Sequence, residues 1–163
     1  IMKWFLVVLR CLCACGVSAK CDDKGYREFD FWLGDWQVYT SDGKLAGRNI
    51  ITVDYNHCVI KERYTSVSGY QGESLGIYDI TRKLWHQTWV DNTGLLLQLE
   101  GNLQGNVMVL TGSDFDKAGN YLEERITWTP NADGTVRQVW KTKALDQKWQ
   151  VIFDGLYIKK AEK

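Results

Sequence analysis

The feature that most constrains the fold is a repeated pattern in which a short strand-like run is followed by a turn signal. Turns such as Asp42-Gly43, Gly119-Asn120 and Asp133-Gly134 contain residues that adopt the positive φ angles of hairpins. The runs between turns are rich in Val, Ile, Thr, Trp and Tyr, which favour a pleated, half-buried surface. The pattern predicts about ten strands: 36–40, 47–54, 57–66, 73–79, 84–91, 94–102, 106–114, 121–129, 134–143 and 148–158.

Short consecutive turns make neighbouring strands antiparallel, so the simplest topology is an up-and-down meander. A sheet of this length curls, and closure removes both of its exposed edges. A helical period is found only in one short turn at Tyr26–Leu33. The 163 residues suffice for one domain. We therefore expect an all-β protein with a single antiparallel up-and-down β-barrel over residues 29–160, preceded by an N-terminal segment, 20–28.

Residues 1–19 differ from the rest of the chain and have the outline of a secretory signal peptide. Met2-Lys3 is positively charged, Trp4–Leu9 is apolar, and Val17-Ser18-Ala19 offers small residues for cleavage. Two alternatives remain open at this point: a lipobox-like Leu12–Cys15 that would leave a lipid anchor on Cys15, or an uncleaved anchor or tail. The apolar stretch is shorter than the roughly 20 residues of a membrane-spanning helix. The sequence thus predicts a secreted or periplasmic protein without a transmembrane span.

Cys21 and Cys58 remain after such a cleavage, and an even number of cysteines in an oxidising compartment can pair. A disulfide between them would attach the N-terminal segment to an early strand. The other interpretation is a buried free Cys58 and a mobile Cys21. The sequence leaves both open.

Alternation along the strands predicts which side chains face the barrel interior, since residues two apart share a face. In 57–66, Glu62 shares its face with Cys58, Ile60 and Tyr64, and opposes Lys61 and Arg63. In 121–129 neither face is cleanly apolar, which leaves Arg125 as a candidate for the interior. The expected lumen residues, which are also the candidate ligand-binding residues, are Glu62, Tyr64, Trp85, Gln87, Trp89, Arg125, Gln138 and Trp140.

A structural explanation competes with this interpretation. Glu62 and Arg125 would then only neutralise each other, because a buried charge is costly unless it is paired. The tryptophans would be ordinary core residues.

Metal, cofactor and nucleic-acid chemistry find little support in the sequence. His57 and His86 lie on different predicted strands, and apart from Cys58 beside His57 no acid or thiol stands at ligand spacing. Adjacent strand residues face opposite sides, so neither a zinc site nor any other metal site is predicted. Haem would need one of them to face the lumen. Gly-x-Ser-x-Gly and phosphate-binding loops are missing from the sequence, and 20 basic residues balance 20 acidic ones. We expect no cofactor, no nucleic-acid partner and no polybasic membrane patch.

The segment Phe29–Trp36, which reads FDFWLGDW, is the most distinctive motif of the chain. Its Gly34-x-Trp36 is similar to the Gly-x-Trp signature of lipocalin-like (calycin) barrels, where Gly permits a tight approach to the first strand and Trp plugs the closed end. With WHQTWVD at 85–91 and FDGLY at 153–157, the pattern resembles a family of uncharacterised bacterial secreted or periplasmic proteins. The resemblance covers roughly residues 28–160 and implies fold and export but no activity.

One feature departs from the lipocalins, in which a basic residue of the last strand packs over the signature tryptophan. The candidates here, Lys159 and Lys160, follow Tyr157 at the end of the last predicted strand. This position sets the chain apart from true lipocalins.

A mostly apolar cavity with a few polar groups is how small-molecule sites are usually built. We therefore expect an amphipathic or aromatic ligand to stack on Trp85, Trp89 and Trp140 inside the lumen. One alternative is a barrel enzyme (an isomerase, cyclase or hydrolase) with Glu62 as general base and Arg125 as anion holder. Another is a packed barrel that serves as an interaction module.

Overall fold

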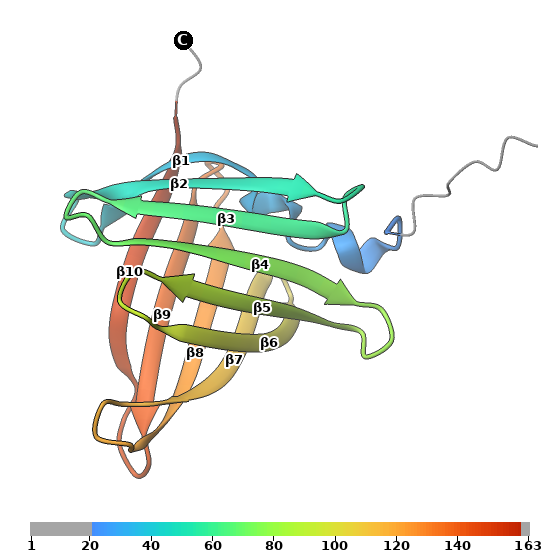
Figure 1. Ribbon diagram of the computed structural model, residues 1–163. Coiled ribbons are helices and arrows are strands. Elements are labelled where there is room, and N and C mark those ends of the chain that lie inside the picture. Colours follow the sequence, from blue (N-terminus) through green and yellow to red (C-terminus); the bar gives the residue numbers. More distant parts are fainter. Residues whose placement is uncertain (1–20, 161–163) are drawn as a thin grey trace, which may run out of the picture.

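Ten strands joined by tight turns form a closed antiparallel barrel in the computed structural model, which describes residues 21–160 (Figure 1). Each strand pairs with its neighbours in sequence, and β1 pairs with β10 to close the ring. The strands are β1 Gly34–Thr40, β2 Leu45–Asp54, β3 Val59–Ser66, β4 Gln71–Asp79, β5 Leu84–Asp91, β6 Leu96–Gln104, β7 Val107–Phe115, β8 Tyr121–Pro130, β9 Val136–Ala144 and β10 Gln150–Lys159. The predicted fold class is confirmed.

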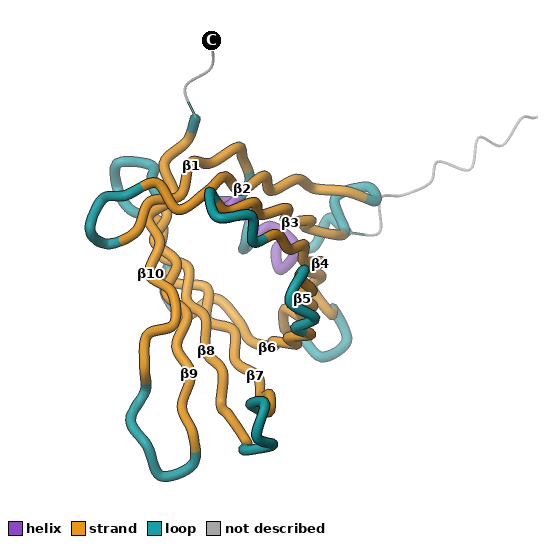
Figure 2. The backbone as a smooth tube through the Cα atoms, turned by 60° about the vertical axis from the view of Figure 1, so that its left-hand side comes forward, coloured by secondary structure: helices purple, strands orange, loops and turns teal. Residues whose placement is uncertain are grey.

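The ring is not a regular cylinder. In Figure 1, β2 to β5 cross the direction of β8 to β10 steeply, and Figure 2 places the β7–β8 and β9–β10 hairpins beyond the rest of the ring. Several turns contain left-handed residues, as predicted, including Gly43, Gly119 and Gly134. The β2–β3 turn reaches the same conformation without glycine, through Tyr55, Asn56 and His57.

One end of the barrel is closed by two short 3-10 helices, η1 (Lys24–Arg27) and η2 (Asp30–Trp32). The Phe29 ring stacks on Trp32, with 4.9 Å between the ring centroids, and meets Trp85 and Trp128 edge-on. The Trp36 side chain is completely buried, and its Nε1 donates a hydrogen bond of 2.9 Å to the Trp32 carbonyl. These rings form an aromatic plug, which consists of Phe29, Trp32, Trp36, Trp85 and Trp128. Trp36 thus helps to close this end of the barrel, as the Gly-x-Trp resemblance implied.

Gly34 enters β1 with a φ of 149°, a conformation that L side chains rarely adopt. A Cβ at this position would lie 3.2 Å from Nε1 of Trp36. Glycine therefore allows the chain to turn into β1 directly against the tryptophan ring.

The last strand carries a lysine over this tryptophan, contrary to the departure expected from the sequence. Trp36 and Lys159 are cross-strand partners, and Lys159 Nζ lies 5.4 Å from the centroid of the Trp36 ring. The prediction was wrong because β10 continues to Lys159, so its C-terminal residues still pair with β1.

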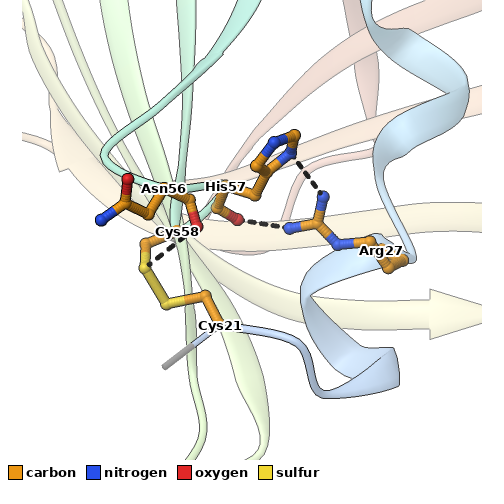
Figure 3. Close-up of a disulfide and its surroundings, with 5 residues drawn as sticks. All are labelled: Cys21, Arg27, Asn56, His57 and Cys58. Carbon is orange, nitrogen blue, oxygen red and sulfur yellow. Dashed lines mark hydrogen bonds between the residues drawn. A yellow bond between two sulfur atoms is a disulfide. The ribbon is translucent and has the colours of Figure 1, made fainter. Parts of the chain in front are cut away.

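Cys21 and Cys58 form a disulfide, so the paired alternative holds (Figure 3). The bridge joins the segment before η1 to the turn that precedes β3. Arg27 adds a second attachment, because its guanidinium donates to the His57 carbonyl and lies 3.5 Å from Nδ1 of the same residue (Figure 3). Together these contacts hold the aromatic plug against the barrel.

Removing the disulfide by the paired change Cys21→Ser and Cys58→Ser should lower the free energy of unfolding by about 2–4 kcal/mol. The bridge closes a loop over a sequence separation of 37, and its loss releases the entropy of that loop in the unfolded chain. Urea titration under oxidising conditions measures the change. An unfolding midpoint equal to that of the wild type would contradict the prediction.

Among the described helices, none combines the length and the apolar character needed to cross a membrane. The predicted signal peptide and the lipid-anchor alternative at Cys15 fall on residues outside 21–160.

Candidate ligand-binding cavity

A cavity of about 200 Å³ occupies the lumen on the side away from the aromatic plug. The plug lies where β1 begins, so the opposite end carries the β1–β2, β3–β4, β5–β6, β7–β8 and β9–β10 turns. Residues next to these turns, such as Tyr70 and Phe153, form part of the wall. The lining residues are Glu62, Tyr64, Tyr70, Gln87, Trp89, Leu97, Ile126, Trp128, Gln138, Trp140, Ile152, Phe153 and Tyr157.

Alternation along the strands placed most of the candidate residues in this wall. Six of the eight candidates line the cavity, on strands β3, β5 and β9: Glu62, Tyr64, Gln87, Trp89, Gln138 and Trp140. Alternation predicts these positions correctly because one face of each strand points into the lumen and the other points to solvent.

Two candidates are placed elsewhere, and the structure corrects both. Trp85 faces inward, but it is buried in the aromatic plug against Phe29 and Tyr78 and does not reach the cavity. Arg125 is exposed on the outer face of β8, where it lies near Lys141 and Trp149. Arg125 therefore does not meet Glu62.

Within residues 21–160, Glu62 is the one carboxylate in the cavity wall, and it accepts hydrogen bonds on both oxygens. Asn49 Nδ2 donates to Oε1 at 2.6 Å, and Ser74 Oγ donates to Oε2 at 2.7 Å. Gln87 Nε2 lies 3.5 Å from Oε2 and donates to Ser74 Oγ at 2.9 Å. Side chains from β2, β4 and β5 thus fix the orientation of the Glu62 carboxylate on β3.

Burial raises the pKa of Glu62 to about 7, against the hydrogen bonds from Asn49 and Ser74, which lower it. Desolvation disfavours the charged form, and no cation among residues 21–160 compensates for it. The carboxyl group is consequently poised to gain or lose a proton near neutral pH.

The hydrogen-bonded network continues across the lumen to β10 and β9. Asn49 Nδ2 lies 3.3 Å from the Tyr157 hydroxyl, which donates to Gln138 Oε1. Burial, followed by the nearby charge of Glu62, raises the pKa of Tyr157 well above its usual value. Tyr157 therefore stays protonated and acts as a neutral donor at the floor of the cavity.

Towards the open end, Asp91 orients two aromatic rings. The Tyr70 hydroxyl donates to its Oδ2 at 2.7 Å, and Trp89 Nε1 donates to the same oxygen at 3.0 Å. Burial opposes ionisation of Asp91, but hydrogen bonds from Thr93, Tyr70 and Trp89 outweigh it and lower the pKa to about 2. Gly72 makes room for this arrangement, because a Cβ there would lie 2.1 Å from Cζ2 of Trp89.

A second buried carboxylate holds the other cavity tryptophan. Glu124 Oε2 accepts a hydrogen bond of 2.5 Å from Trp140 Nε1, and its Oε1 accepts one of 3.1 Å from Thr142. Burial raises the pKa of Glu124, against these two hydrogen bonds. Glu124 faces the interior but is not part of the cavity wall.

Sequence reasoning missed several residues of the site. Asn49 could have been found, because it shares the alternating face of Gly47 and Ile51 on β2. Ser74 lies directly opposite Glu62 in the β3–β4 register, which a strand alignment could also reveal. The remaining missed wall residues are Tyr70, Leu97, Ile126, Trp128, Ile152, Phe153 and Tyr157.

Neither histidine faces the lumen. His86 lies on the other face of β5, with Nδ1 3.0 Å from Glu100 and Nε2 2.9 Å from Thr88. His57 lies in the exposed β2–β3 turn. Within residues 21–160, His, Cys, Asp and Glu side chains form no group of three or more that could hold a metal ion.

Comparison with known proteins adds no identification: no protein-family model matches the chain, and no curated protein matches it significantly.

Proposed function

We propose that this protein binds a small amphipathic or aromatic molecule in the barrel lumen and works in the cell envelope or the secreted space. The observation that carries the proposal is the cavity itself, an apolar and aromatic hollow with one oriented carboxylate and two amides in its wall. Sites for small molecules usually combine a largely apolar lining with a few placed polar groups. The extracytoplasmic location is supported by the Cys21–Cys58 disulfide, since such bonds persist in oxidising compartments.

The cavity volume limits the ligand. About 200 Å³ is below the roughly 300–1,000 Å³ of pockets for drug-sized molecules. A ligand with a single ring or a small fused ring system matches this space. Its flat face would contact Trp89 and Trp140, and its polar end would reach Glu62, Gln87 and Gln138.

The enzyme alternative loses one of its two residues, because Arg125 lies outside the barrel and cannot hold an anion beside Glu62. The binding proposal keeps six of its eight predicted residues and loses Trp85 and Arg125. The geometry therefore favours binding over catalysis.

Filling the lumen tests the proposal. Leu97 is buried in the cavity wall, whereas the adjacent Leu96 is exposed on the outer face of the same strand. In Leu97→Trp the larger side chain should occupy the cavity and weaken binding of 2-phenylethanol, a neutral aromatic probe, at least about tenfold. Leu96→Trp is the matched control and should bind as the wild type does.

Binding is measured by ligand-observed NMR, with circular dichroism to verify that both variants are folded. Equal binding by the two variants, or no binding of the probe to the wild type, would contradict a ligand site in the lumen.

A further inference from the structure

The charged groups of the cavity wall are all acidic. Across the described part of the chain, the cavity lining contains Glu62 but no Lys, Arg or His. Basic side chains of the surrounding strands are used instead on the outer surface, where they pair with acids: Arg48 with Asp35, Arg63 with Glu73, Arg137 with Asp154 and Lys143 with Glu123. A ligand that enters the lumen therefore meets no basic side chain, and it meets a negative charge wherever Glu62 is ionised.

Glu62 has hydrogen-bond donors but no counter-ion. Asn49 and Ser74 satisfy both carboxylate oxygens, yet they are neutral groups and do not balance the charge. A nearby positive charge stabilises the ionised form of a buried carboxylate, and among residues 21–160 no basic side chain does so for Glu62. A cation bound in the cavity would supply this charge, because Glu62 forms part of the cavity wall.

The two cavity tryptophans do not offer their indole N–H groups to a ligand. Trp89 Nε1 is bound to Asp91 and Trp140 Nε1 to Glu124. A ligand in the cavity can meet these rings only through their carbon surfaces, whose π electrons attract cations. Donation of the N–H to a carboxylate increases the electron density of the indole ring, which strengthens its attraction for a cation.

We infer that the ligand is an organic cation, a protonated or quaternary amine on a flat apolar body, with its charged nitrogen beside Glu62 and its body between the cavity aromatics. This inference rests on the proposed function and names the chemical class of its ligand. A carboxylate or phosphate ligand would be repelled by Glu62 and would find no basic partner in the wall.

Three probes that share a phenylethyl or benzyl body separate the classes: phenethylamine as a cation, 2-phenylethanol as a neutral molecule and phenylacetate as an anion. Isothermal titration calorimetry near pH 8, where Glu62 is largely ionised, should give at least about tenfold tighter binding of phenethylamine than of 2-phenylethanol. Phenylacetate should bind most weakly.

Glu62→Gln should abolish the preference for the amine over the alcohol, while Glu62→Asp should keep part of it. Glu73→Gln on the outer face of β4 removes the same charge from a strand next to β3 and is the matched control. It should retain the full preference. Circular dichroism verifies that each variant is folded.

The preference is the readout, so the outcomes are distinct from those of the lumen-filling test. Equal affinity for the amine and the alcohol, or tighter binding of the alcohol or the acid, would overturn the cation inference and leave the lumen as a binding site. An amine preference that survives in Glu62→Gln would also overturn it. Loss of binding for all three probes in the wild type would overturn the inference together with the proposed function.

Discussion

Trp36→Ala is expected to lower the free energy of unfolding by about 3–5 kcal/mol, the range typical of a buried tryptophan truncated in a core. The Trp36 side chain is completely buried, donates to the Trp32 carbonyl and carries Lys159 over its ring. Its removal leaves a void under η2 and one carbonyl without its partner. Urea unfolding followed by circular dichroism measures the loss.

Trp149→Ala is the control, because Trp149 is 38% exposed in the β9–β10 loop and contacts Lys143 on the surface. Its replacement should change the free energy of unfolding by less than about 1 kcal/mol. Similar losses in the two variants would contradict the assignment of Trp36 to the plug that closes the barrel.

The second large expected effect is a pH dependence of the free energy of unfolding, which the titration of Glu62 causes. Its pKa is about 7 in the folded protein and 4.5 as an unperturbed group. Between these values the folded state holds a proton that the unfolded state has lost, so the free energy of unfolding falls as pH rises and is lowest above pH 7. At 1.36 kcal/mol for each pKa unit, the wild type should lose about 3 kcal/mol relative to Glu62→Gln between about pH 4 and pH 9.

The ionisable groups near Glu62 do not contribute to this difference in stability between the two proteins. Tyr64, Tyr70 and Tyr157 all have raised pKa values and stay neutral over the range. Asp91, whose pKa is about 2, stays ionised. Glu124, the other buried carboxylate, is present in both proteins, so its contribution cancels in the difference. Parallel stability curves for the wild type and Glu62→Gln would show that Glu62 is not desolvated in the folded state.

Most of the fold could be predicted from the sequence because turns and alternation are local signals. The β5 strand, Leu84–Asp91, has the predicted bounds, and the other strands differ from prediction by one or two residues at one or both ends. The ends shift because the exact turn conformation decides them, as in the β2–β3 turn, where His57 has a φ of 64° and Cys58 is pulled towards Cys21.

The candidate site was only partly predictable, because alternation gives the face of a strand but not the depth along the barrel. Trp85 and Trp89 share the inner face of β5, yet Trp85 lies in the plug and Trp89 in the cavity. The difference arises from η2 and Phe29, which fill one end of the lumen through contacts distant in sequence.

Arg125 was misplaced for a different reason. Glu123, Glu124 and Arg125 are consecutive and all charged, so hydrophobicity cannot decide which face is inside. Glu124 is the inward residue because Trp140 and Thr142, from the next strand, donate to its carboxylate. Such a cross-strand partner is visible only once the register of β8 and β9 is known.

The most direct test of a lumen that receives an organic molecule at Glu62 is a crystal structure of the protein with phenethylamine. We expect the ammonium group within hydrogen-bond distance of the Glu62 carboxylate and the ring between Trp89 and Trp140. A lumen closed by repacked side chains, or phenethylamine bound only to the outer surface, would contradict the account.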